Sequence, residues 1–172
     1  MNLEQSVTLV DYHCWARDRI LDAVRPLTHE QYTRDMGNSF RSIRDTLVHI
    51  YGADLVWYER WRGGSPRALA DPSGFPDVPS LRRAWTDLGR MYREHVEELG
   101  EDGISRVLHY HLLNGQPCAN AFWEMLQHVV NHGCYHRGQL TTMLRQLGAT
   151  APKPMDLIVF YRERQAGAGT VR

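Results

Sequence analysis

The chain has 172 residues, of which 42% are hydrophobic and 23% are charged. This length and composition predict one soluble globular domain rather than a disordered or fibrous protein. Twenty lysines and arginines balance twenty aspartates and glutamates, so the formal net charge is zero. A neutral chain has no general attraction for nucleic acid or for an anionic membrane, so we expect neither as a partner.

The length of the apolar runs and the spacing of the cysteines indicate the cellular compartment in which we expect the protein. No apolar run approaches the roughly 18 residues that a membrane helix needs, and no signal-peptide pattern opens the chain. The three cysteines are odd in number and have no CxxC spacing; they are Cys14, Cys118 and Cys134. A reduced, cytoplasmic compartment fits them best.

The first third of the chain shows helical spacing of its apolar residues. Residues 4–24 predict a helix that ends before Pro26. Thr28 and Gln31 have the spacing of a capping box and predict a short helical turn. A second long helix is expected over residues 39–61, where a pair of glycines follows.

The middle of the chain changes character. Residues 63–80 contain three glycines, four prolines and three serines, which predicts a loop that is long for a compact domain. A third helix is expected over residues 80–99. Residues 104–119 then predict a short β-hairpin, because Asn114-Gly115 is the strongest two-residue hairpin turn signal.

The last third predicts a fourth long helix over residues 120–147, with Asn120 as its N-cap. A short helix is expected from Asp156. We therefore predict an all-α four-helix bundle, with a β-hairpin before the fourth helix and a short C-terminal helix. Residues 1–164 would form this single domain, and residues 165–172 a disordered tail.

Three histidines follow one another at intervals of four residues on the fourth helix: His128, His132 and His136. Two histidines at this spacing share a helix face and can bind one metal ion. His128 and His136 are roughly 12 Å apart along the helix axis. One ion can therefore bind only two of the three histidines, and these two must be adjacent in the series. Spacing alone leaves open whether the pair is His128 with His132 or His132 with His136.

A third ligand has to come from another helix. His49 lies among mostly apolar or small neighbours on the second helix, so we expect it to face the interior. It could complete a three-histidine site, or it could be a core histidine that bonds a protein group. The remaining five histidines are expected at the surface: His13, His29, His95, His109 and His111.

The segment from His128 to Gln139 resembles the signature of the DinB-like family. The similarity extends over nearly the whole chain, including residues 39–53, the hairpin and residues 154–161. This resemblance implies a four-helix bundle, usually dimeric, that holds a divalent metal ion with three histidines. By position these are His49, His132 and His136, which leaves His128 as an interior residue or a neighbour of the ligands.

Other residues near the signature have supporting roles in this interpretation. Gln139 lies one turn after His136 and could hydrogen-bond a ligand imidazole or a substrate. Asn131 and Arg137 are expected to cap or pair at a bundle or dimer surface. Cys134 should point away from His136 and be an inert small side chain.

Three neutral nitrogen ligands leave coordination positions open, as in catalytic sites. The resemblance extends to thiol S-transferases that use low-molecular-weight thiols and to a thiol-dependent isomerase. We therefore expect a metal-dependent thiol S-transferase or hydrolase, with zinc or nickel, a thiol as a further cofactor and a small-molecule substrate. The alternatives are a stress-associated homodimer that binds metal without catalysis, and an interaction module with core histidines.

Overall fold

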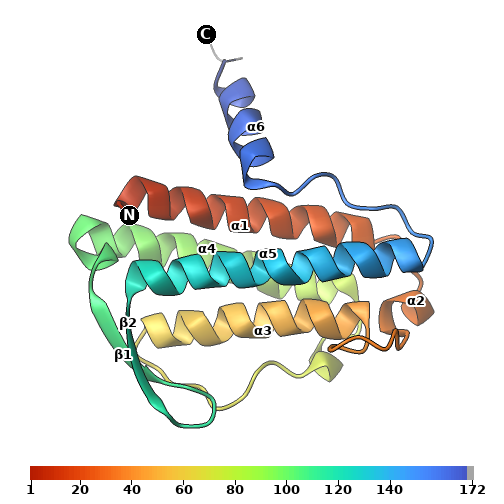
Figure 1. The fold of residues 1–172 in the computed structure, drawn as a ribbon, viewed down its shortest axis with the longest axis horizontal. Helices are drawn as coiled ribbons and strands as arrows, with labels where there is room; N and C mark the ends of the chain where they lie inside the picture. The colour runs from red at the N-terminus through yellow and green to blue at the C-terminus, as the bar shows by residue number, and fades with distance from the viewer. Residues whose placement is uncertain (170–172) are drawn as a thin grey trace.

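The computed structural model describes residues 1–169, in which long helices lie side by side (Figure 1). These helices are α1 (Leu3–Val24), α3 (Ile43–Trp61), α4 (Val78–Ile104) and α5 (Phe122–Gln146). Helix α1 packs against α4 and α5, and α3 packs against α5 and α4. The predicted helical fold is confirmed. None of the helices within residues 1–169 is long and apolar enough to cross a membrane.

The shorter elements are α2 (His29–Thr33), the 3-10 turn η1 (Pro72–Gly74), β1 (Val107–His111), β2 (Pro117–Ala121) and α6 (Leu157–Gly169). Strands β1 and β2 form the predicted antiparallel hairpin. Its turn contains Gly115, whose φ of 89° lies in the left-handed region that favours glycine. Both the hairpin and the C-terminal helix were therefore predicted correctly.

Two helices begin later than expected because their first residues bond elsewhere. Asn120 is not the N-cap of α5, since it pairs with Leu108 in the hairpin, and α5 begins at Phe122. Helix α3 begins at Ile43 rather than at residue 39. Ser42 caps it, and the Ser42 hydroxyl accepts a 3.0 Å hydrogen bond from the backbone N–H of Asp45.

The ends of two helices test our predictions. The backbone of α4 is non-helical at Gly100, where φ is 63° and ψ is −175°, so the regular helix is interrupted after Leu99, as expected, and a further helical segment follows to Ile104. Helix α6 continues through residues 165–169, which we had expected to belong to a disordered tail. Gln165 and Ala166 are good helix formers and extend it. Residues 170–172 of that expected tail lie outside the described residues.

The bundle is held by one apolar core to which every long helix contributes. Ile20, Leu47, Leu81 and Leu140 come from α1, α3, α4 and α5, and none of them is exposed to solvent. Burying one such side chain stabilises the folded state by about 1.5–3 kcal/mol. The core therefore fixes the position of α3 relative to α5, the two helices that carry the candidate ligands.

The long loop between α3 and α4 packs closely on α3. A Cβ atom at Gly52 would lie 2.9 Å from the backbone nitrogen of Ala70, so only glycine fits there without a shift. The ring of Phe75 meets the ring of Tyr51 edge-on, with centroids 5.1 Å apart. The loop is thus attached to α3 one turn after His49.

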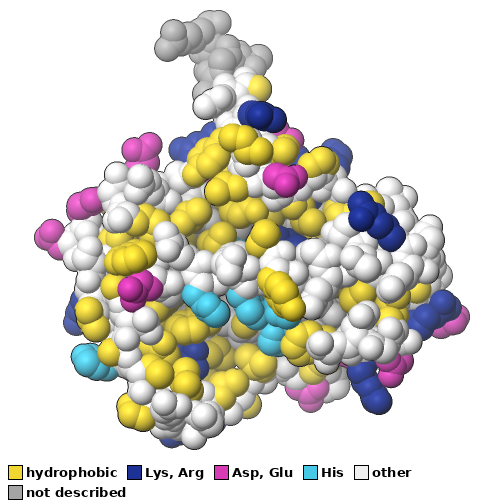
Figure 2. Space-filling model, viewed as in Figure 1, with side chains coloured by type: hydrophobic (Ala, Val, Ile, Leu, Met, Phe, Trp, Pro, Cys, Tyr) yellow, Lys and Arg dark blue, Asp and Glu magenta, His cyan; other side chains and the backbone are white. Residues whose placement is uncertain are grey.

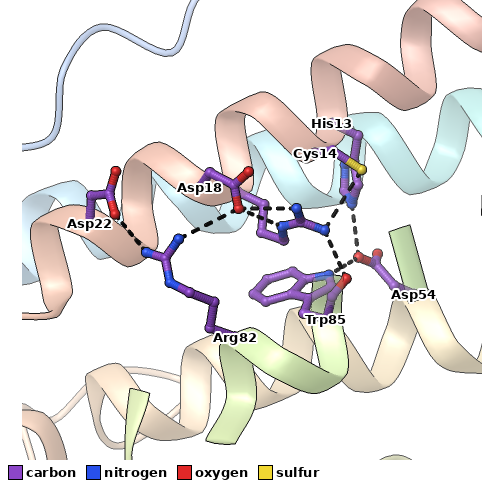
Figure 3. Close-up of polar contacts among 8 residues, drawn as sticks. His13, Cys14, Asp18, Asp22, Asp54, Arg82 and Trp85 are labelled. Carbon is purple, nitrogen blue, oxygen red and sulfur yellow. Dashed lines mark hydrogen bonds and ion pairs between the residues drawn. The ribbon is translucent and has the colours of Figure 1, made fainter. Parts of the chain in front are cut away.

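A buried polar network links three helices inside the bundle (Figure 3). The carboxylate of Asp54 on α3 accepts hydrogen bonds of 2.8 Å from His13 Nε2 on α1 and from Trp85 Nε1 on α4. Asp54 is 1% exposed and His13 is 3% exposed. The prediction of a surface position for His13 was therefore wrong, because its imidazole pairs with a carboxylate 41 residues away.

Two further residues are buried where we expected surface positions. His95 is 8% exposed, and its ring packs against those of Trp61 and Phe122. Arg137 is 2% exposed. Its guanidinium occupies the space left by a glycine, since a Cβ at Gly133 would lie 2.7 Å from Arg137 Nη1. His29, His109 and His111 are exposed, as predicted.

We predict that the thiol of Cys14 is unreactive because its surroundings bury it. Burial raises the pKa of Cys14 from 9.0 to about 11, more than the neighbouring Arg17 lowers it. At pH 8 the thiolate fraction should fall about a hundredfold, and alkylation should slow accordingly. Timed labelling with iodoacetamide and peptide mapping should show the exposed Cys134 reacting first. Equal labelling rates for the two cysteines would contradict this prediction.

Candidate metal centre

Helices α3 and α5 bring the three predicted ligands together. His49 projects from α3, and His132 and His136 project from adjacent turns of α5. His132 Nε2 lies 3.1 Å from His49 Nε2 and 3.1 Å from His136 Nε2. One nitrogen from each histidine lies within 4.8 Å of the others. The third nitrogen donor therefore does come from another helix.

The arrangement of these nitrogens is compatible with a shared metal ion. With metal–nitrogen bonds of about 2.0–2.1 Å and tetrahedral angles, neighbouring ligand nitrogens lie roughly 3.3–3.4 Å apart. The separations of 3.1 Å are close to this value. A neutral imidazole has one N–H, so three such groups facing one another leave lone pairs opposed. A cation would accept all of them.

Gln139 orients one of the candidate ligands. His136 Nδ1 lies 2.7 Å from Gln139 Oε1, so the imidazole donates its Nδ1 hydrogen to the amide oxygen. This bond keeps the lone pair of His136 on Nε2, the atom that faces His132. Hydrogen bonds of this kind hold metal-binding histidines in the correct tautomer and orientation.

The electrostatic environment keeps two imidazoles neutral. Burial, with a smaller contribution from repulsion by His136, lowers the pKa of His49 and the pKa of His132 from 6.5 to about 4. A neutral imidazole is the form that binds a metal ion. At pH 7 neither His49 nor His132 has to lose a proton before it can act as a ligand.

The same pKa shifts predict that the metal-free protein loses stability in acid. Between pH 6.5 and pH 4 the unfolded chain binds more protons at His49 and His132 than the folded chain does, so stability is complete above pH 6.5 and falls towards pH 4. The slope is on the order of 1 kcal/mol per pH unit for each imidazole. Urea unfolding of wild type and His49→Gln over this range measures it, and the variant should show the smaller slope. Parallel slopes would contradict the prediction.

Aromatic side chains surround the three histidines. The ring of Phe40 stacks on His49 at 3.9 Å between centroids, and the ring of Tyr135 lies 5.0 Å from that of His136. Tyr135 is 66% exposed. Figure 2 shows histidines reaching the surface in the middle of this face, with hydrophobic side chains around them. The helix predicted over residues 39–61 included Phe40, but α3 begins only at Ile43, so this contact was not foreseen.

His128 lies beside the three histidines but is not an interior residue, contrary to one of our expectations. Its side chain is exposed, and its ring centroid lies 5.8 Å from that of His132 and 5.0 Å from that of Trp57. Burial of part of the ring, and the charge of Arg60, lower its pKa. His128 thus extends the row of imidazoles towards the solvent.

The other residues singled out near the signature lie apart from the three histidines. Asn131 is exposed. Cys134 is also exposed, and it lines a pocket of about 340 Å³ between α5 and residues 152–156. That pocket includes none of the three candidate ligands.

Comparison with known proteins places the chain in a family. Residues 1–166 match the model of the DinB family. Protein DinB of Bacillus subtilis (strain 168) is 29% identical over 165 residues, which cover 91% of this chain and 95% of that protein. The uncharacterized protein YizA of the same organism is 24% identical over 140 residues, which cover 80% of this chain and 84% of YizA.

A solved structure shows the same fold. A DinB-like protein from Bacillus cereus ATCC 10987 superposes with a TM-score of 0.66 and covers 85% of this chain and 95% of its own length. Its sequence identity is only 17%, so this likeness concerns the fold. Because the family model spans residues 1–166 of the 172, the chain belongs to the DinB family.

Proposed function

We propose that this protein binds one divalent metal ion through His49, His132 and His136 and acts as a thiol S-transferase on a small electrophile. The proposal is carried by the position of His132 Nε2, which lies 3.1 Å from the Nε2 atoms of both His49 and His136. When bound, such an ion supplies a positive charge that deprotonates a thiol ligand outright. Gln139 holds His136 in the tautomer that this site requires.

The surroundings of the three histidines favour a thiol over water as the nucleophile. Within residues 1–169 no carboxylate hydrogen-bonds to any of the three histidines, so no acidic side chain is placed there as a general base. The Asp54 carboxylate acts on them only through space, and it is held by His13 and Trp85. A thiol needs no such base, because its pKa starts far below that of water.

The aromatic rim supports an organic substrate. Phe40 and the exposed Tyr135 flank the histidines and offer flat apolar surface to an electrophile. Binding sites for small molecules are mostly apolar, with a few polar groups that orient the ligand. The Tyr135 side chain, which contacts His136 and is otherwise open to solvent, is well placed for such a contact.

A hydrolase is the second candidate, and His128 is the observation in its favour. Its exposed imidazole lies one turn before His132, and its lowered pKa keeps it neutral at pH 7. A neutral imidazole at this place could accept a proton from water. In that reaction His128→Ala would remove most of the activity, whereas thiol transfer would not need His128.

The experiment uses protein loaded with zinc or nickel, both of which imidazole ligands accept. A chlorinated aromatic electrophile is incubated with a panel of low-molecular-weight thiols, and the loss of free thiol is followed. We expect metal-dependent consumption that is absent in His132→Ala and retained in His128→Ala. Ester hydrolysis that fails in His128→Ala would favour the hydrolase. Metal binding without either reaction would contradict both enzymatic functions and indicate a metal-binding protein without catalysis.

We also propose that the protein is a homodimer, as in the family that it resembles. Helix α6 extends away from the bundle (Figure 1) and exposes Ile158 and Tyr161. Light scattering coupled to gel filtration should give twice the chain mass of 19.9 kDa. A mass of one chain at micromolar concentration would refute the dimer.

A further inference from the structure

A second candidate site lies at the end of the bundle where α3 ends and β1 begins. A pocket of about 360 Å³ opens between the last turn of α3, helix α4 and strand β1. Its polar wall consists of Arg60, Trp61, Arg62, His95, Arg106 and His109. Arg60 lies eleven residues after His49, which is roughly 16 Å along the helix axis, so the pocket is separate from the three histidines.

The charge of this pocket is positive. Three guanidinium groups and two imidazoles line it, and no carboxylate does. Most arginines elsewhere on the helices pair with acids, for example Arg19 with Glu163 and Arg82 with Asp22. In contrast, none of the ion pairs within residues 1–169 includes Arg62 or Arg106. The exposed Glu98 partly offsets the effect of Arg62 on the pKa of His95.

Buried nitrogens in the pocket wall lack hydrogen-bond partners. They are Arg60 Nε, Trp61 Nε1 and His95 Nε2, on side chains that are between 4% and 8% exposed. A buried polar group without a partner destabilises the folded state, so its presence calls for an explanation. The Arg60 and Trp61 nitrogens can only donate hydrogen bonds. A ligand that satisfied them would therefore have to be an acceptor.

We propose that this pocket binds the phosphoryl group of a small phosphorylated molecule. A phosphoryl group offers three acceptor oxygens and up to two negative charges, which match several donors and three guanidiniums better than one carboxylate does. The pocket volume exceeds what a phosphoryl group alone fills. Trp61 and Leu108 supply an apolar wall for an organic substituent.

The test follows the indole N–H signal of Trp61 by NMR while inorganic phosphate, phenyl phosphate or benzoate is added to the metal-free protein. The signal is assigned by its loss in Trp61→Phe. We expect phenyl phosphate to shift it at lower concentration than inorganic phosphate, because the ring contacts the apolar wall. We expect benzoate to bind at least tenfold more weakly. No shift with either phosphate, or equal binding of benzoate, would overturn the proposal.

Variants show whether the pocket is the site. Arg62 and Arg106 are exposed, so Arg62→Gln and Arg106→Gln should fold, and each should weaken phenyl phosphate binding about tenfold. Arg90→Gln is the matched control, since Arg90 is an exposed arginine of α4 outside the pocket. An equal loss in Arg90→Gln would overturn the proposal in favour of a general charge effect.

A further variant separates this proposal from the metal centre. His132→Ala should bind phenyl phosphate as well as wild type does, because His132 does not line the pocket. Loss of binding in that variant would place the anion at the three histidines and overturn the proposal. Failure of the thiol-transfer assay has no bearing on this result.

Discussion

Replacing His132 with alanine is expected to abolish stoichiometric binding of a divalent metal ion. His132 Nε2 is the central donor, 3.1 Å from the Nε2 atoms of both His49 and His136. Without it, two imidazoles from different helices remain. Loss of a supporting hydrogen bond alone typically lowers metal affinity 10–100-fold, and loss of a ligand costs more. Elemental analysis after dialysis, together with calorimetric titration with zinc, measures the effect.

Two neighbours on α5 provide graded controls for this experiment. His128→Ala should retain one ion per chain, because no hydrogen bond within residues 1–169 joins His128 to the three histidines. Gln139→Ala should bind with about 10–100-fold lower affinity, because His136 Nδ1 loses its 2.7 Å partner. Wild-type affinity in His132→Ala would show that the three histidines are not the site.

Replacing Asp54 with alanine is expected to cost about 3–5 kcal/mol of unfolding free energy. The substitution leaves His13 Nε2 and Trp85 Nε1 without their acceptor in a region closed to water. It also creates a cavity between three helices. Urea unfolding of the metal-free protein, followed by circular dichroism, gives the change directly.

The control for this second prediction is an aspartate at the surface. Asp87→Ala should change stability by less than about 0.5 kcal/mol, because its pair with Arg90 is exposed. If Asp54→Ala does not accumulate, Asp54→Asn keeps an oxygen acceptor and should lose less. A loss below about 1 kcal/mol in Asp54→Ala would mean that the network contributes little to stability.

The cluster of three histidines was largely predictable because it depends on short-range helix geometry. Residues four apart on one helix share a face whatever the rest of the fold does, which places His132 and His136 together. The apolar neighbours of His49 indicated an inward orientation. The hairpin was equally local, since Asn114-Gly115 specifies its turn. The choice of His136 over His128, however, depended on the family resemblance.

Partners far apart in sequence account for what could not be predicted. His13 is buried because Asp54 meets it across the bundle, and no pattern within α1 reveals that carboxylate. Arg137 is buried against helix α1, where its guanidinium carbon lies 5.9 Å from the centre of the Tyr12 ring. Helix α5 begins later than predicted because Asn120 pairs with Leu108 in the hairpin. Tertiary contacts decided each of these positions.

The two halves of the three-histidine cluster are far apart along the chain. His49 and His132 are separated by 83 residues, which include the long loop, α4 and the hairpin. An ion held between them would therefore act as a removable cross-link that closes about half of the polypeptide into one loop. Ligands that bind only the folded state raise its population by mass action. The lifetime of this protein would then follow the free metal concentration around it, and a chelator would shorten that lifetime.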